Sequence, residues 1–85
     1  MKTVCAYVWA ARTRLVESGL RPEEASIDAE TLARSVLGWD RATYLSNHRA
    51  EAPSRFAHQY LAVLNRREQR EPVSLIIGRR EFWGL

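Results

Sequence analysis

The chain has 85 residues, of which 46% are apolar, with 13 Lys and Arg against 10 Asp and Glu and one cysteine. This length suits a single domain, and the composition excludes a collagen repeat, a coiled coil, a membrane span and a disulfide scaffold. The net charge of +3 is too small to indicate nucleic-acid binding, and the lone Cys5 fits a reducing compartment. We therefore expect a cytoplasmic protein that does not bind membranes.

The first predicted helix runs from Thr3, as its N-cap, to Gly19, which favours the left-handed conformation that ends helices. Its apolar residues recur at helical spacing: Val4, Val8, Ala11 and Leu15. Leu20 is placed to fold back on this helix, and Pro22 prevents its continuation. The apolar stretch after Lys2 is too short to span a bilayer and lacks a small-residue cleavage site, so we interpret it as helix rather than signal peptide.

The second helix is predicted from Ser26, as N-cap, to Gly38. It has the apolar stripe of a helix packed on a core: Ala29, Leu32, Ala33, Val36 and Leu37. Asp28 and Glu30 then fall where the helix dipole favours anions. A short third helix is expected from the Asp40 cap through Arg41 to Ser46, with Ala42 and Leu45 facing inward.

Residues 47–52 are predicted to form a polar loop, and Pro53 suits the first position of a fourth helix. That helix is expected to end near Arg70 and to bury Phe56, Tyr60, Leu61 and Leu64. Residues 73–77 allow one further helical turn, which we expect Gly78 to close. The sequence therefore predicts an all-α protein: a small bundle of about five helices in residues 1–78, followed in residues 79–85 by an extended segment that would begin a linker hairpin.

Residues that could carry chemistry are few. His48 and His58 have no partners at metal-ligand spacing, no serine lies in a nucleophile turn, and the four glycines are dispersed. The three tryptophans are interpreted as core or interface anchors rather than as a base-stacking platform. The residues alone therefore indicate a helical module without catalytic, cofactor-binding or metal-binding residues.

The C-terminal quarter carries the most specific pattern of the chain. It has paired arginines at 66 and 67, a Glu-Pro step at 71 and 72, Gly78, and Glu-Phe-Trp-Gly-Leu over residues 81–85. This pattern resembles the N-terminal domain of the bacterial glutamine methyltransferase that acts on peptide-chain release factors. Residues 28–30, Leu32 and the Leu-Gly step at 37 and 38 are similar to that family's second helix. Leu75 and Ile77 depart from the family pattern, which often has an aromatic residue and a threonine there.

The resemblance implies a bundle of about five helices that recognises a class 1 peptide-chain release factor. It also implies an absent C-terminal domain, joined through a β-hairpin, that binds S-adenosylmethionine and methylates the glutamine of the release factor's Gly-Gly-Gln loop. No catalytic residue of the family falls on this chain. Two alternatives remain open on the residues: a helix-turn-helix DNA-binding domain and a stand-alone helical adaptor.

Charge is unevenly distributed, with −1 over residues 1–40 and +4 over residues 41–85. The positive half supplies the candidate partner-binding residues Arg66, Arg67, Arg70, Arg79 and Arg80. The alternative interpretation of the first three is that they compensate the negative end of a helix dipole. The apolar ending supplies candidate residues for packing against the absent domain: Phe82, Trp83 and Leu85.

Overall fold

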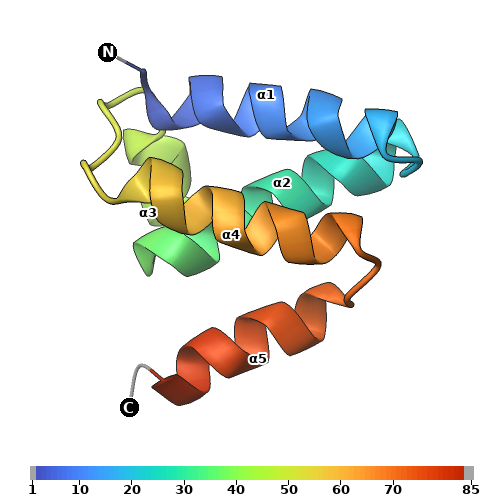
Figure 1. Ribbon diagram of the computed structural model, residues 1–85. Helices are drawn as coiled ribbons and strands as arrows, with labels where there is room; N and C mark the ends of the chain where they lie inside the picture. The colour runs from blue at the N-terminus through green and yellow to red at the C-terminus, as the bar shows by residue number, and fades with distance from the viewer. Residues whose placement is uncertain (1, 84–85) are drawn as a thin grey trace.

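Five α-helices follow one another in the computed structural model, which describes residues 2–83, with side chains through Gly78. They are α1 (Val4–Glu17), α2 (Pro22–Leu37), α3 (Arg41–Asn47), α4 (Phe56–Glu68) and α5 (Val73–Trp83) (Figure 1). This architecture confirms the predicted all-α bundle of about five helices. None of the helices within residues 2–83 is long and apolar enough to cross a bilayer.

Helix α1 has the predicted ends. The Thr3 hydroxyl accepts a hydrogen bond from the Ala6 amide, and Gly19 adopts a left-handed conformation with φ of 116°. The Leu20 amide donates back to the Leu15 carbonyl at 3.1 Å, and the Leu20 side chain is buried. This closure satisfies carbonyl groups that the helix end would otherwise leave unpaired.

Helix α2 begins five residues earlier than predicted, with Arg21 rather than Ser26 as its N-cap residue. Pro22 occupies its first turn, where a missing amide proton costs nothing and the fixed φ suits a helix. The prediction of Ser26 as N-cap is therefore wrong, because Ser26 lies inside the helix and its hydroxyl accepts from Arg12 Nε at 2.7 Å. Glu23 and Glu24, rather than Asp28 and Glu30, occupy the first turn.

Helix α3 keeps the predicted Asp40 cap, whose carboxylate accepts from the Thr43 amide at 2.7 Å. The predicted inward face is wrong, because Ala42 and Leu45 are exposed and Tyr44 is buried instead. Burial of the large Tyr44 ring, which stacks on His48 at 5.2 Å, removes more apolar surface than burial of an alanine.

The loop after α3 docks on the start of α1. The carbonyls of Ala50 and His48 accept hydrogen bonds from the amides of Val4 at 3.1 Å and Cys5 at 2.7 Å. These amides lie in the first turn of α1, where no intrahelical acceptor exists. Two segments that are distant in the sequence are thereby joined at one end of the bundle.

Helix α2 lies behind α1 and α4 and contacts both of them and α5 (Figure 1). Leu32 is fully buried, and so are Ala29 and Ala33 beside it. Tyr60 of α4 is 2% exposed, and its hydroxyl donates to the Ala29 carbonyl at 2.7 Å, which satisfies both polar groups in the core. Burial raises the pKa of Tyr60 far beyond its usual range.

Helix α4 begins at Phe56, because Pro53 lies in a turn and its carbonyl accepts from the Phe56 amide at 2.9 Å. The predicted start at Pro53 is therefore wrong. Three of the four residues predicted to be buried are buried, but Leu61 is 47% exposed. Val63 is buried in its place.

Helix α5 continues through Gly78 to Trp83, so the predicted helix end at Gly78 and the extended segment after it are wrong. Gly78 does not adopt the left-handed conformation seen at Gly19 and Gly38. A glycine inside a helix weakens it by about 1 kcal/mol but does not stop it, and the residues that follow are good helix formers. The assignment of residues 79–85 to a linker stays a prediction.

We expect Gly78→Ala to raise the free energy of unfolding by about 0.5–1 kcal/mol, because alanine restricts the unfolded chain and favours the helix. A Cβ atom at this position would meet nothing within 4 Å. Urea unfolding followed by circular dichroism measures the change. Gly19→Ala is the control, since its φ of 116° is strained for alanine and its Cβ would lie 2.7 Å from Arg70 Nη2. Destabilisation by Gly78→Ala would contradict a helical Gly78.

Candidate partner-binding surface

The arginine cluster predicted to bind a partner, Arg66, Arg67 and Arg70, lies where α4 ends and the chain turns into α5. Arg67 is held most firmly: its Nε donates to Asp28 at 2.9 Å, and its Nη2 donates to Glu24 at 3.0 Å. The side chains of Arg67 and Asp28 are 14% and 11% exposed. This ion pair ties α4 to α2 from within the bundle.

The other two members of the cluster also contact this chain. Arg66 forms an ion pair with Glu71, which lies in the turn before α5. Arg70 adopts a left-handed conformation with φ of 70°, and its Nη2 donates to the Ser18 carbonyl at 2.7 Å, at the C-terminal end of α1. The guanidinium thus lies at the negative end of the α1 dipole. Of the three arginines, Arg70 thus contacts a helix end, whereas Arg66 and Arg67 form ion pairs with carboxylates of this chain.

The remaining predicted site residues lie outside the described side chains: Arg79, Arg80, Phe82, Trp83 and Leu85. Their assignment to partner binding or interdomain packing stays a prediction, as does a binding role for the arginine cluster.

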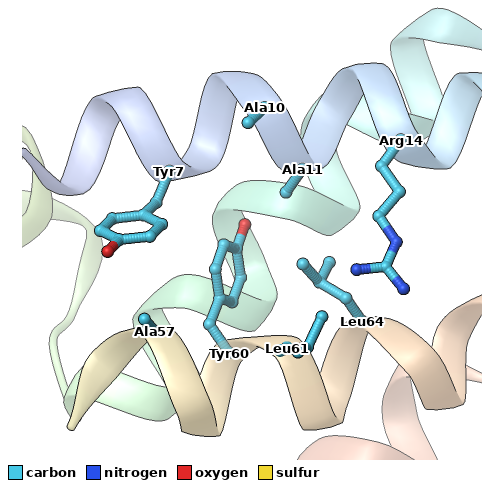
Figure 2. Close-up of a pocket in the computed structure, with 8 residues that line it drawn as sticks. All are labelled: Tyr7, Ala10, Ala11, Arg14, Ala57, Tyr60, Leu61 and Leu64. Carbon is cyan, nitrogen blue, oxygen red and sulfur yellow. The ribbon is translucent and has the colours of Figure 1, made fainter. Parts of the chain in front are cut away.

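A groove that the sequence analysis missed runs between α1 and α4 (Figure 2). The two helices are parallel and touch near both ends. Tyr7 and Phe56 form an edge-to-face pair with ring centroids 5.3 Å apart. At the other end, Arg14 donates to Asn65 at 2.5 Å and to Glu68 at 2.5 and 2.8 Å. The hydrogen bond with Glu68 raises the pKa of Arg14.

Between these contacts, small side chains leave the space between the two helices unfilled. The α1–α4 groove has a volume of about 270 Å³ and is lined by Tyr7, Ala10, Ala11, Arg14, Ala57, Tyr60, Leu61 and Leu64. Figure 2 shows Ala10 and Ala57 facing the gap from opposite helices, with the Tyr60 ring standing between them. The surface is therefore mostly apolar and open to solvent.

No pattern in the sequence marks this groove. Leu61 of α4 fits the helical period of buried residues, but the facing helix α1 lines the groove with Ala10 and Ala11, whose side chains are too small to cover it. Periodicity identifies which face of a helix points toward its neighbours, whereas the size of the opposing side chains decides whether that face is covered.

A second hollow of about 330 Å³ lies between the end of α2 and the start of α4. It is lined by Val36, Leu37, Pro53, Arg55, Phe56 and Gln59. Among the described side chains, which run through Gly78, no three of His, Cys, Asp or Glu lie close enough to hold a metal ion. Neither hollow is lined by a His, Cys, Asp or Glu residue.

The comparisons with known proteins agree on one family. Residues 7–78 match the model of the PrmC N-terminal domain. The chain is similar to the release factor glutamine methyltransferases of Caulobacter vibrioides, at 35% identity over 76 residues, and Agrobacterium fabrum, at 32% over 83 residues. It is 45% identical over 62 residues to the protein of that name from Rhodospirillum rubrum. No solved structure matches the chain.

The matched regions cover 89%, 98% and 72% of this chain but 26%, 28% and 19% of the three relatives. The chain thus spans about a quarter of the length of the curated relatives that it matches.

Proposed function

Because the chain belongs to the PrmC N-terminal domain family, we propose that it is the release-factor-recognition domain of a protein-glutamine methyltransferase. The parent enzyme would use S-adenosylmethionine to methylate the glutamine of the Gly-Gly-Gln motif in class 1 peptide-chain release factors, in translation termination. The observation that carries this proposal is the family match over residues 7–78, which includes the whole of α2, α3 and α4 and parts of α1 and α5.

A recognition domain is needed for this chemistry. An enzyme that modifies one side chain of a folded protein gains specificity and orientation from contacts remote from the reacting atom. In this proposal the helical bundle holds the release factor while a separate methyltransferase domain binds the cofactor and the glutamine amide. The partners of the chain are then the release factor and that domain.

The two hollows lack one group that commonly holds a nucleoside cofactor. Nucleoside cofactors are commonly held through a carboxylate that accepts from the ribose hydroxyls. Neither the α1–α4 groove nor the second hollow is lined by an acidic residue. No step of the methyl transfer is therefore assigned to this chain.

The helix-turn-helix alternative finds no support in α3. This helix has seven residues, its cation Arg41 is paired with Glu30 at 3.1 Å, and Tyr44 is buried. A recognition helix needs several side chains free to reach base edges. We therefore propose recognition of a protein rather than of DNA.

We expect the ¹⁵N-labelled chain to bind an unmethylated class 1 release factor and not to bind S-adenosylmethionine. The measurement is a pair of titrations followed by amide chemical shifts, which detect weak as well as strong binding. Catalytic activity of the chain alone is expected to be absent. Saturable micromolar cofactor binding, or the absence of shift changes with the release factor, would contradict the proposal.

A further inference from the structure

The α1–α4 groove is an open, mostly apolar surface lined by residues of two helices. We propose that this groove is the surface that receives the release factor, and that it takes an apolar side chain flanked by a carboxylate. This inference rests on the proposed function and assigns that function to particular residues. It places recognition on a different face from the arginine cluster.

The arginine cluster has little charge left to offer a partner. Arg67 is neutralised by Asp28 and Glu24, and Arg66 by Glu71. Each of these ion pairs must be broken before its arginine can bind a new anion, so the pairs oppose recognition of an acidic partner at that place. Arg70 keeps its charge but directs one guanidinium nitrogen to the Ser18 carbonyl.

The groove, in contrast, is accessible and preformed. Leu61 is 47% exposed, and Ala10 and Ala57 are exposed on the facing helices. The seven-residue interval from Tyr7 to Arg14 corresponds to about 10 Å along α1, enough for one or two side chains of a partner. Figure 1 shows α1 and α5 on opposite sides of α4, so α5 does not cover the groove. Contacts at both ends fix its width, which lowers the cost of binding.

The charge around the groove indicates the chemistry of its occupant. Helices α1 and α4 begin at the same end of the groove, and neither first turn contains an acidic residue. Lys2 lies there, with its Nζ 5.1 Å from the centre of the Tyr7 ring. The opposite end holds the mutually neutralised Arg14 and Glu68. A carboxylate on the partner is therefore favoured beside Lys2.

The same end carries two further cations. Arg49 lies in the loop that docks on α1, and Arg55 immediately precedes α4. Among the described residues neither forms an ion pair, and Glu51 is the acidic residue of this segment. The net positive potential at this end complements an acidic partner and speeds its association.

The test compares variants of the 85-residue chain in ¹⁵N titrations with an unmethylated class 1 release factor. Ala57→Arg fills the groove and Leu61→Glu makes it polar, and both change exposed helix positions. We expect each to weaken binding by about tenfold or more. Trp9→Ser is the matched control. Trp9 is also an exposed residue of α1, at 66%, but it does not line the groove, and its ring lies against Arg12, which donates to Ser26 of α2. It should change the affinity less than about twofold.

A second pair of variants tests the charge. Lys2→Ala should weaken binding several-fold at low salt and little at high salt, because an exposed charge is screened. Arg21→Ala removes an exposed cation from the turn between α1 and α2 and should leave the affinity unchanged. A salt-independent loss with Lys2→Ala, or an equal loss with Arg21→Ala, would overturn the carboxylate assignment.

The unaltered chain supplies a measure that does not depend on how variants fold. Its largest shift changes on titration should fall at the amides of Ala10, Ala57 and Leu61. If the unaltered chain binds but these amides do not move and the groove variants bind normally, the groove assignment is overturned while the proposed function stands. If the unaltered chain does not bind, both are overturned.

Discussion

Leu32→Ala is expected to lower the free energy of unfolding by about 2–5 kcal/mol. Leu32 lies in the middle of α2, the helix that contacts α1, α4 and α5, and its side chain is fully buried. Truncation removes the transfer free energy of the lost carbons and leaves a cavity that three neighbouring helices cannot all close. Small domains have about 5–15 kcal/mol of stability in total, so this loss is a large part of it.

The measurement is urea unfolding followed by circular dichroism, with Leu45→Ala as the matched control. The control makes the same substitution in a helix, but Leu45 is 53% exposed. It should cost no more than about 0.5 kcal/mol, as is usual for surface positions. If the two variants lose equal stability, the assignment of Leu32 as buried and Leu45 as exposed is wrong.

This pair of leucines also shows how far sequence reasoning reaches. Both were predicted to face inward from helical spacing, but only Leu32 belongs to a long stripe in which the apolar period repeats over several turns. In the seven residues of α3, two apolar positions do not define a face, and the larger Tyr44 takes the buried position. Periodicity therefore predicts long amphipathic helices better than single turns.

Helix ends were predictable where one signal acted alone. Thr3, Gly19 and Asp40 act as expected because each satisfies a local backbone group. The error at Ser26 came from a competing start signal, because Pro22 also suits a first helical position. At Pro53 the start signal is present, but the helix begins three residues later, at Phe56. Gly78 was predicted to end a helix, but glycine only permits the left-handed conformation and does not require it.

The candidate site was harder to predict than the fold for a physical reason. A run of arginines is visible in the sequence, but their partners Asp28, Glu24 and Ser18 lie far from them along the chain. The α1–α4 groove depends on alanines from two helices facing one another, and no local pattern marks that arrangement. Charge clusters thus need their tertiary partners before they can be interpreted as binding surfaces.

Arg67→Met is expected to lower the free energy of unfolding by about 3–5 kcal/mol, because it leaves the carboxylate of Asp28 poorly solvated and without its partner. Asp28 is 8% exposed, and its 2.9 Å hydrogen bond with Arg67 joins α2 to α4. Arg14→Met is the control: Arg14 also binds a glutamate on another helix, but its side chain is 37% exposed. A pair of that exposure contributes about 0–1 kcal/mol.

The double variant Arg67→Met with Asp28→Leu separates two effects on stability: the loss of the ion pair, and the cost of leaving the Asp28 carboxylate buried without a partner. Replacing both members with apolar side chains leaves no unpaired carboxylate, so the double variant should regain most of the stability lost by Arg67→Met. Glu24, the second partner of Arg67, has a side chain that is 52% exposed and can be solvated without it. Urea unfolding of the unaltered chain, Arg67→Met, Asp28→Leu and the double variant gives the coupling energy between the two residues. If Arg67→Met costs no more than Arg14→Met and instead abolishes release-factor binding by a folded chain, Arg67 belongs to the recognition surface rather than to the junction of α2 and α4.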